Sequence, residues 1–131
     1  FMIYDLEKNE RRAVFSDSTQ ANSYIVRLKL LGKNTRLMQS MFIADRKPGS
    51  EVTYNDGRSV ARLYRSDGAH DITGLSASPN SQYAAVEVAP QQGSSFDNYP
   101  VNGRNMSTRT ALIGQNGTIV RTIDGCGVVW K

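Results

Sequence analysis

The feature that most constrains the fold of this chain is a succession of short apolar segments separated by turn-forming residues. The segments are rich in β-branched and aromatic residues, which is typical of β-strands. None of them approaches the roughly 18 apolar residues that a membrane-spanning helix needs. We therefore predict an all-β protein with no membrane span. The predicted strand segments are residues 2–4, 13–15, 24–26, 41–43, 83–88, 112–113 and 118–123.

One stretch, residues 25–42, also carries a helical pattern. Leu28, Leu31 and Met38 are among its apolar residues that could be placed on one helix face. Gly32 lies in the middle of the stretch and is followed by Lys and Asn, a combination that indicates a turn. We predict two strands here and no helix.

The turn signals are informative about how the strands are connected. Asp67 with Gly68, and Asn116 with Gly117, are dipeptides that favour the positive φ angles of tight hairpins. We expect a hairpin at each, and a third one around residues 7–9. The spacing of about 50 residues between the two dipeptides is typical of a repeat architecture.

Residues 75–86 (LSASPNSQYAAV) resemble the WD-like propeller repeat of TolB-type proteins. In that repeat a strand ends in Ser-Pro-Asp-Gly, and a polar residue, an aromatic residue and a second apolar strand follow. Asn80 and Ser81 stand where the family has Asp and Gly, and Ala77 stands where an aromatic is usual. The resemblance extends over about residues 59–131 and is weaker before them.

The resemblance implies four-stranded antiparallel blades of a β-propeller, although strand-turn-strand units of this kind also occur in β-sandwiches. A closed propeller needs about four to eight blades, so two to three blades make an incomplete, open one. We expect the chain to be a part of a larger propeller, or else to pair its open edges with another copy as a homo-oligomer. The expected divisions are 1–20 as an outer hairpin, 21–73 and 74–125 as blades, and 126–131 as the first strand of a further blade. The expected strands are 25–30, 35–44, 59–65 and 69–72 in the earlier blade, and 75–77, 82–88, 109–114 and 118–123 in the later one.

The sequence contains no constellation typical of an enzyme. His70 is the only histidine, and Asp71 cannot orient it as a catalytic triad requires, because adjacent strand residues point to opposite faces. His70 and Cys126 are too far apart for zinc-ligand spacing, and no calcium-binding loop pattern is present. We expect no enzymatic activity, no metal and no cofactor. Cys126 is expected to be a small buried side chain and cannot form an internal disulfide, which leaves the compartment open.

The net charge of +4 is concentrated in the first half of the chain. A basic half can serve an acidic partner, but solvated strand faces and loops are the simpler explanation, which we favour. Aromatic residues do not alternate with the basic ones as a stacking platform for nucleic acid requires. We expect no nucleic-acid partner.

Two long segments, residues 45–58 and 90–108, are the expected binding loops. Each would join the second and third strands of its blade, so both would emerge on the same propeller face. Loops on a rigid scaffold carry binding, and exposed aromatic residues make good interface anchors. The alternative is that the loops are merely long. The candidate binding residues are Arg46, Lys47, Tyr54, Phe96 and Tyr99.

These observations lead to two hypotheses about function. The first is a non-catalytic interaction module that is part of a larger bacterial protein and binds a protein, a peptide or a glycan. The resemblance alone favours a periplasmic or cell-surface location. The alternative is the propeller domain of a larger serine hydrolase of the prolyl-oligopeptidase kind, with its catalytic domain elsewhere in the gene. A Gly-x-Ser-x-Gly segment downstream would favour the alternative.

Overall fold

The computed structural model describes residues 2–13, 23–32, 34–44, 47–90 and 108–131. Across these ranges the chain forms ten β-strands and no helix, and strands account for more than half of the residues. The all-β prediction is confirmed. In the same ranges there is also no helix that could cross a membrane.

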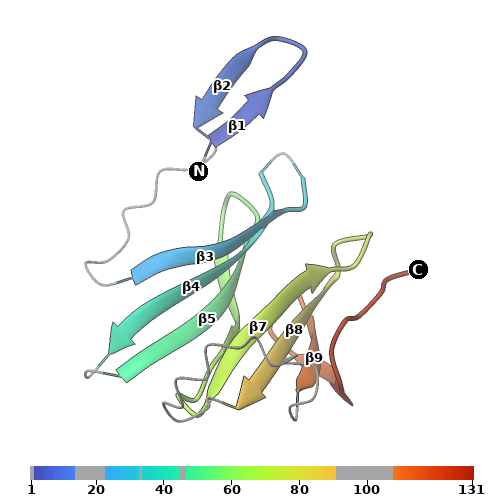
Figure 1. The fold of residues 1–131 in the computed structure, drawn as a ribbon. Helices are drawn as coiled ribbons and strands as arrows, with labels where there is room; N and C mark the ends of the chain where they lie inside the picture. Colours follow the sequence, from blue (N-terminus) through green and yellow to red (C-terminus); the bar gives the residue numbers. More distant parts are fainter. Residues whose placement is uncertain (1, 14–22, 33, 45–46, 91–107) are drawn as a thin grey trace, which may run out of the picture.

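The strands form three antiparallel sheets (Figure 1). The smallest is a hairpin of β1 (Met2–Asp5) and β2 (Glu10–Ala13), which stands apart from the others in Figure 1. The two four-stranded sheets are called sheet 1 and sheet 2. Sheet 1 has the order β3-β4-β5-β6 and sheet 2 the order β7-β8-β9-β10, so that in each sheet every strand pairs with the next one in the chain. Sheet 1 consists of β3 (Ser23–Leu30), β4 (Arg36–Ala44), β5 (Lys47–Asn55) and β6 (Val60–Arg65). Sheet 2 consists of β7 (His70–Ala77), β8 (Tyr83–Pro90), β9 (Arg109–Gly114) and β10 (Ile119–Asp124).

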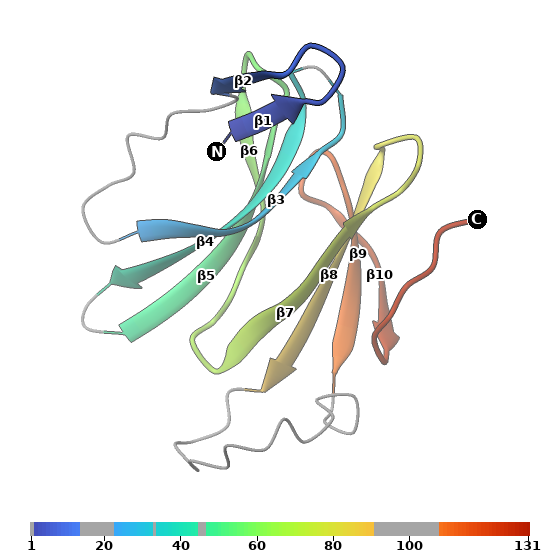
Figure 2. The same cartoon turned by 45° about the horizontal axis from the view of Figure 1, so that its top comes forward.

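Sheet 1 and sheet 2 lie next to each other (Figure 2), and the core lies between them. Side chains alternate between the two faces of a strand, so every second residue of β8 points to sheet 1. The core combines three residues of sheet 1 with a larger set from sheet 2. These core residues are Leu37, Val52 and Leu63 from sheet 1, and Ile72, Leu75, Ala84, Val86, Val88, Ala111 and Ile113 from sheet 2.

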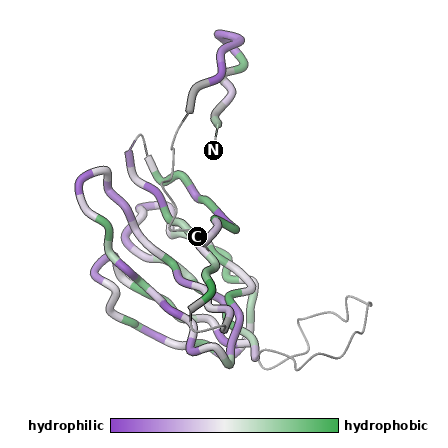
Figure 3. The backbone as a smooth tube through the Cα atoms, turned by 90° about the vertical axis from the view of Figure 1, so that its left-hand side faces the viewer, coloured by the Kyte–Doolittle hydropathy of each residue, from purple (hydrophilic) through white to green (hydrophobic). Residues whose placement is uncertain are grey.

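Hydrophilic residues gather at the tip of the β1–β2 hairpin (Figure 3). The hairpin turn runs over Leu6 to Asn9, and Asn9 adopts a positive φ of 53°. The hairpin predicted around residues 7–9 is confirmed. So is the hairpin at Asn116, where the backbone N–H of Gly114 donates to the carbonyl of Thr118 and the turn joins β9 to β10.

Residues 25–42 form two strands, β3 and β4, as predicted. The later predicted blade corresponds to sheet 2, whose four antiparallel strands contain or overlap the four expected segments. Its identity as a propeller blade stays a prediction.

The connection through Asp67 and Gly68 is not a hairpin, and that prediction is wrong. β6 belongs to sheet 1, whereas β7 pairs with β8 in sheet 2, so this turn passes from one sheet to the next. Gly68 does have the expected positive φ, 80°, but such a turn suits a connection between sheets as well as a hairpin. Residues 69–72, expected as the fourth strand of the earlier blade, precede or begin β7, which runs on through the boundary expected after residue 73.

The expected loop at residues 45–58 is largely a strand. β5 spans Lys47–Asn55 and is paired on both sides, with β4 and with β6. The sequence did not predict this strand because it contains Pro48 and Gly49, and both residue types are uncommon inside strands. The structure explains Gly49: its Cα faces the ring of Phe42 across the strand pair, and a Cβ there would lie 2.6 Å from a ring carbon.

A polar clamp joins the two sheets at a bulge in β7. The pairing of β7 with β8 is interrupted between Ile72 and Gly74, which leaves the Ile72 and Thr73 carbonyls open to other donors. The Gln39 amide donates to the Ile72 carbonyl at 3.2 Å, and the Arg27 guanidinium donates to the Thr73 carbonyl at 3.0 Å. Arg27 also donates to the Gln39 side-chain oxygen at 2.7 Å, so the two side chains act together.

The C-terminal residues do not form the expected strand. After β10 the chain turns back through Gly125 and Gly127, which both have positive φ angles. The Gly127 N–H donates to the Glu87 carboxylate at 2.7 Å, and the Trp130 indole N–H donates to the Ser76 hydroxyl at 3.0 Å. This segment therefore crosses from β10 to β7 by side-chain contacts and not by strand pairing.

Candidate functional site

A cavity of about 370 Å³ lies between sheet 1 and sheet 2. Its floor is formed by residues of β8, β9 and β10 in sheet 2. Strand pairing aligns Val88 with Arg109 and Asp124 in one row, and Ala111 with Thr122 in the next row on the same face of the sheet. Val88 and Ala111 are buried, whereas Thr122 is exposed, so the cavity is apolar at its floor and opens to solvent beside β10.

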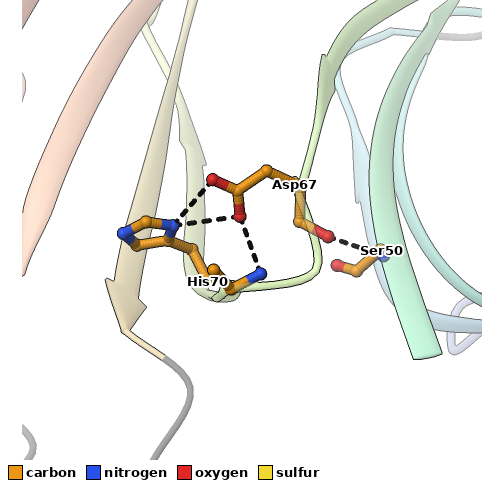
Figure 4. A network of polar contacts seen from close by, with 5 residues as sticks. Ser50, Asp67 and His70 are labelled. Carbon is orange, nitrogen blue, oxygen red and sulfur yellow. Dashed lines mark hydrogen bonds and ion pairs between the residues drawn. The ribbon is translucent and has the colours of Figure 1, made fainter. Parts of the chain in front are cut away.

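A second wall comes from the end of β6, from the connection to β7 and from the first residue of β7. Tyr64, Asp67 and His70 line it, and His70 pairs with Pro90 of the floor. Figure 4 shows the His70 ring beside β8, with Asp67 between that ring and the strand that carries Ser50. The cavity thus collects ionisable groups from both sheets.

Asp67 and His70 form a tight pair. The His70 Nδ1 atom lies 3.0 Å from both carboxylate oxygens of Asp67, and the Ala69 N–H donates to the same carboxylate at 2.8 Å. These hydrogen bonds, with that from His70 the strongest, hold the pKa of Asp67 below its usual value. An ionised carboxylate can only accept, so Nδ1 carries the hydrogen, and when the ring is neutral Nε2 is an acceptor.

The connection that carries this pair is fastened to sheet 1. The Ser50 N–H donates to the Ser66 hydroxyl at 3.0 Å, and the Ser66 N–H donates to the Ser50 carbonyl at 2.8 Å. Because Ser66 directly precedes Asp67, the carboxylate is held at a set place relative to β5.

Two further polar groups complete the lining. Burial, with a smaller contribution from the negative charge of Asp67, raises the pKa of the Tyr64 hydroxyl, so it stays protonated and can donate at neutral pH. The Arg109 Nε atom lies 3.6 Å from an Asp124 carboxylate oxygen, and both side chains are largely exposed, at 68% and 94%. Such a pair contributes little to stability and leaves most guanidinium donors to other partners.

The structure does not bring the sequence-predicted binding residues together. Tyr54 lies on β5, half-buried and packed against the core, so its prediction as an exposed loop aromatic is wrong. Lys47 is the first residue of β5, and its side chain lies outside the described residues. Arg46, Phe96 and Tyr99 also lie outside the described residues.

Two site features escaped the sequence reasoning. The sequence-based prediction considers only Asp71 as a partner of His70, whereas in the structure its partner is Asp67, three residues earlier across a turn. The spacing Asp-Gly-x-His, with an Asp that accepts from the backbone two residues on, was the available signal. Cys126 was expected to be buried and is exposed, because it lies in the segment that follows β10 and not in a strand.

Comparison with known proteins gives no match to a family model, a curated protein or a solved structure. The similarity to TolB-type repeats rests on the sequence segment described above and stays a hypothesis. Within the described ranges, no group of three or more His, Cys, Asp or Glu side chains is arranged to hold a metal ion.

Proposed function

We propose that this chain is a non-catalytic binding module, built from propeller-like blades within a larger bacterial protein, whose ligand site is the cavity between sheet 1 and sheet 2. The observation that carries this proposal is the cavity itself. Ligand sites are typically clefts of about 300–1,000 Å³ with apolar walls and a few converging polar groups. This cavity has a volume of about 370 Å³ and combines an apolar floor with Tyr64, the Asp67–His70 pair and Arg109.

The blade interpretation is supported by the repetition of one sheet design along the chain. Both sheets are four-stranded meanders with the strand order of the sequence. In both, a short turn joins the third strand to the fourth: residues 56–59 in sheet 1 and 115–118 in sheet 2. The turns Asn55 to Gly57 and Asn116 to Gly117, rather than the Asp67–Gly68 connection, are therefore the equivalent positions of the proposed repeat.

A binding role is favoured over hydrolysis by the surroundings of His70. A nucleophile needs a hydrogen bond to the base that activates it, which here would be Nε2. In the described part of the chain, the recorded side-chain partner of His70 is Asp67, through Nδ1. The raised pKa of Tyr64 makes that hydroxyl a donor and a poor nucleophile.

The test is a ligand-observed NMR screen with small carboxylic acids, amines and monosaccharides. Thr122→Trp should block the cavity, because Thr122 is exposed and lines it. Ile123→Trp is the matched control, since Ile123 is the next residue of β10, is also exposed, and does not line the cavity. We expect at least one compound class to bind the wild type and Ile123→Trp but not Thr122→Trp. If no compound shows this pattern, the cavity is not a ligand site and the proposal fails.

A further inference from the structure

We propose that the cavity selects a single carboxylate attached to an aliphatic body, as in an α-amino acid such as leucine or in the C-terminal residue of a peptide, and that Arg109 anchors the carboxylate. This inference rests on the proposed function, since it assumes that the cavity is the ligand site. It adds the chemical class of the ligand and the residue that recognises it.

Arg109 is placed to act as the anchor. It is the first residue of β9 and shares a row with Val88 on the cavity face of the sheet. Its Nε atom faces Asp124 at 3.6 Å, which is longer than a hydrogen bond. The planar guanidinium has five donors, so its remaining N–H groups can bind both oxygens of a carboxylate at once.

The floor beside Arg109 suits an aliphatic body. Val88, Pro90, Ala111 and Ile119 line the cavity, and Ile119 leaves about half of its surface exposed, at 52%. Covering such apolar surface stabilises a complex by about 25 cal/mol for each Å² removed from water. A ligand that joins a carboxylate to an aliphatic side chain therefore satisfies both Arg109 and the floor.

The wall lined by Tyr64, Asp67 and His70 limits the ligand to one negative charge. Asp67 is ionised there and would repel a second carboxylate. When the His70 ring is neutral, its Nε2 atom accepts a hydrogen bond, because Nδ1 carries the hydrogen that faces Asp67. An ammonium group or an amide N–H at the other end of the ligand fits this wall, whereas a dicarboxylate or a phosphate does not.

The test uses three probes that differ only in their polar ends: L-leucine, N-acetyl-L-leucine and L-leucinamide. Binding is measured by titrating each into isotope-labelled protein and following the backbone amide signals. We expect leucine and N-acetyl-leucine to bind and leucinamide, which lacks the carboxylate, to bind at least tenfold more weakly. Tighter binding of leucine would identify a free amino acid as the ligand, and tighter binding of N-acetyl-leucine would identify a peptide C-terminus.

Arg109→Gln tests the anchor, and Arg121→Gln is its matched control. Arg121 is an exposed arginine on β10 that does not line the cavity, and it pairs with Leu112 rather than with a cavity residue. We expect Arg109→Gln to weaken carboxylate binding roughly tenfold or more, as the loss of a charged hydrogen bond does, and Arg121→Gln to leave it unchanged. Thermal unfolding of both variants checks that they fold.

Three results would overturn the inference: equal binding of leucine and leucinamide, unchanged binding by Arg109→Gln, or no binding of any of the three probes. If another compound then binds in a way that Thr122→Trp blocks, only the ligand class is wrong and the binding site stands. If no compound is sensitive to Thr122→Trp, the proposed function fails with it.

Discussion

The side-chain amide of Gln39 in β4 donates a 3.2 Å hydrogen bond to the backbone carbonyl of Ile72 in β7. Gln39 is only 2% exposed, and this bond crosses from one sheet to the other. A buried amide of this kind costs free energy unless its hydrogen bonds are satisfied. Here it is satisfied by the bulge of β7 and by Arg27, so the polar clamp sets the position of one sheet against the other.

The first prediction concerns this clamp. Gln39→Leu keeps a similar volume but removes the 3.2 Å hydrogen bond to the Ile72 carbonyl and the oxygen that accepts from Arg27, which keeps its bond to the Thr73 carbonyl. We expect the free energy of unfolding to fall by about 1–3 kcal/mol, measured by urea denaturation. Gln82→Leu is the control, because Gln82 is exposed, and it should change stability by less than about 0.5 kcal/mol. If Gln39→Leu leaves the free energy of unfolding unchanged, the clamp does not hold the sheets together.

The second prediction compares two glycines with similar backbone angles. Gly117 and Gly68 have φ angles of 82° and 80°. A Cβ at Gly117 would lie 3.0 Å from the Arg62 carbonyl oxygen of sheet 1, whereas a Cβ at Gly68 would meet nothing within 4 Å. Gly68→Ala should cost about 1 kcal/mol for its positive φ alone, and Gly117→Ala should cost clearly more. If thermal or urea unfolding shows that both variants lose the same stability, the close approach of the β9–β10 turn to β6 is contradicted.

The third prediction concerns the carboxyl group of Asp67. Its pKa should lie below the ordinary value of 3.8 and should rise toward it in His70→Asn, because the hydrogen bond from His70 is the main cause of the shift. NMR titration of the carboxyl carbon measures this, and Asp56 is the internal control, since its pKa is lowered by the Ser59 and Arg58 backbone N–H groups instead. The Asp56 pKa should not change in the variant.

The same shift sets a direction for stability. A carboxyl group whose pKa is lower in the folded than in the unfolded protein stabilises the fold above its unfolded value. The Asp67 contribution is therefore present above about pH 3.8 and is lost as the pH falls through the lower folded pKa. Asp67→Asn should flatten this part of the stability profile, and an unchanged profile would contradict the assignment.

The fourth prediction concerns Trp130, the only tryptophan of the chain. Its indole N–H donates to the Ser76 hydroxyl, and the side chain is half-buried. Ser76→Ala removes this acceptor, so Trp130 should become more accessible to acrylamide quenching. Ser59→Ala, in the β5–β6 turn, should leave the quenching unchanged. If Ser76→Ala has no effect, the C-terminal segment does not rest on β7 as described.

The fifth prediction concerns Cys126, which is exposed. The folded protein should react fully with a thiol reagent such as DTNB without denaturant, because Cys126 is exposed within the described part of the chain. The rate in native buffer and the rate in urea should be similar. A reaction that requires unfolding would restore the expectation of a buried cysteine.

The strands themselves were predictable because their signals are local. Alternating apolar residues and turn dipeptides identified β8, β9 and β10 and separated β3 from β4 at Gly32. β5 escaped because Pro48 and Gly49 contradict strand propensity, and only the ring of Phe42 on the paired strand explains the glycine. Local strand propensity cannot predict such a contact, because it involves a residue of a different strand.

The sequence by itself determined that this protein is made of short antiparallel strands, because strand alternation and turn chemistry are encoded in neighbouring residues. Only the tertiary structure decided which sheet each strand joins. The Asp67–Gly68 turn passes between sheets because β7 pairs with β8, a choice that depends on burying Ile72 and Leu75 against sheet 1. That choice also creates the cavity and brings Arg109 and His70 to its lining, although these residues are 39 positions apart by their numbers and unrelated by any local pattern. Burial of apolar surface acts on the whole chain at once, which is why the site could not be found one segment at a time.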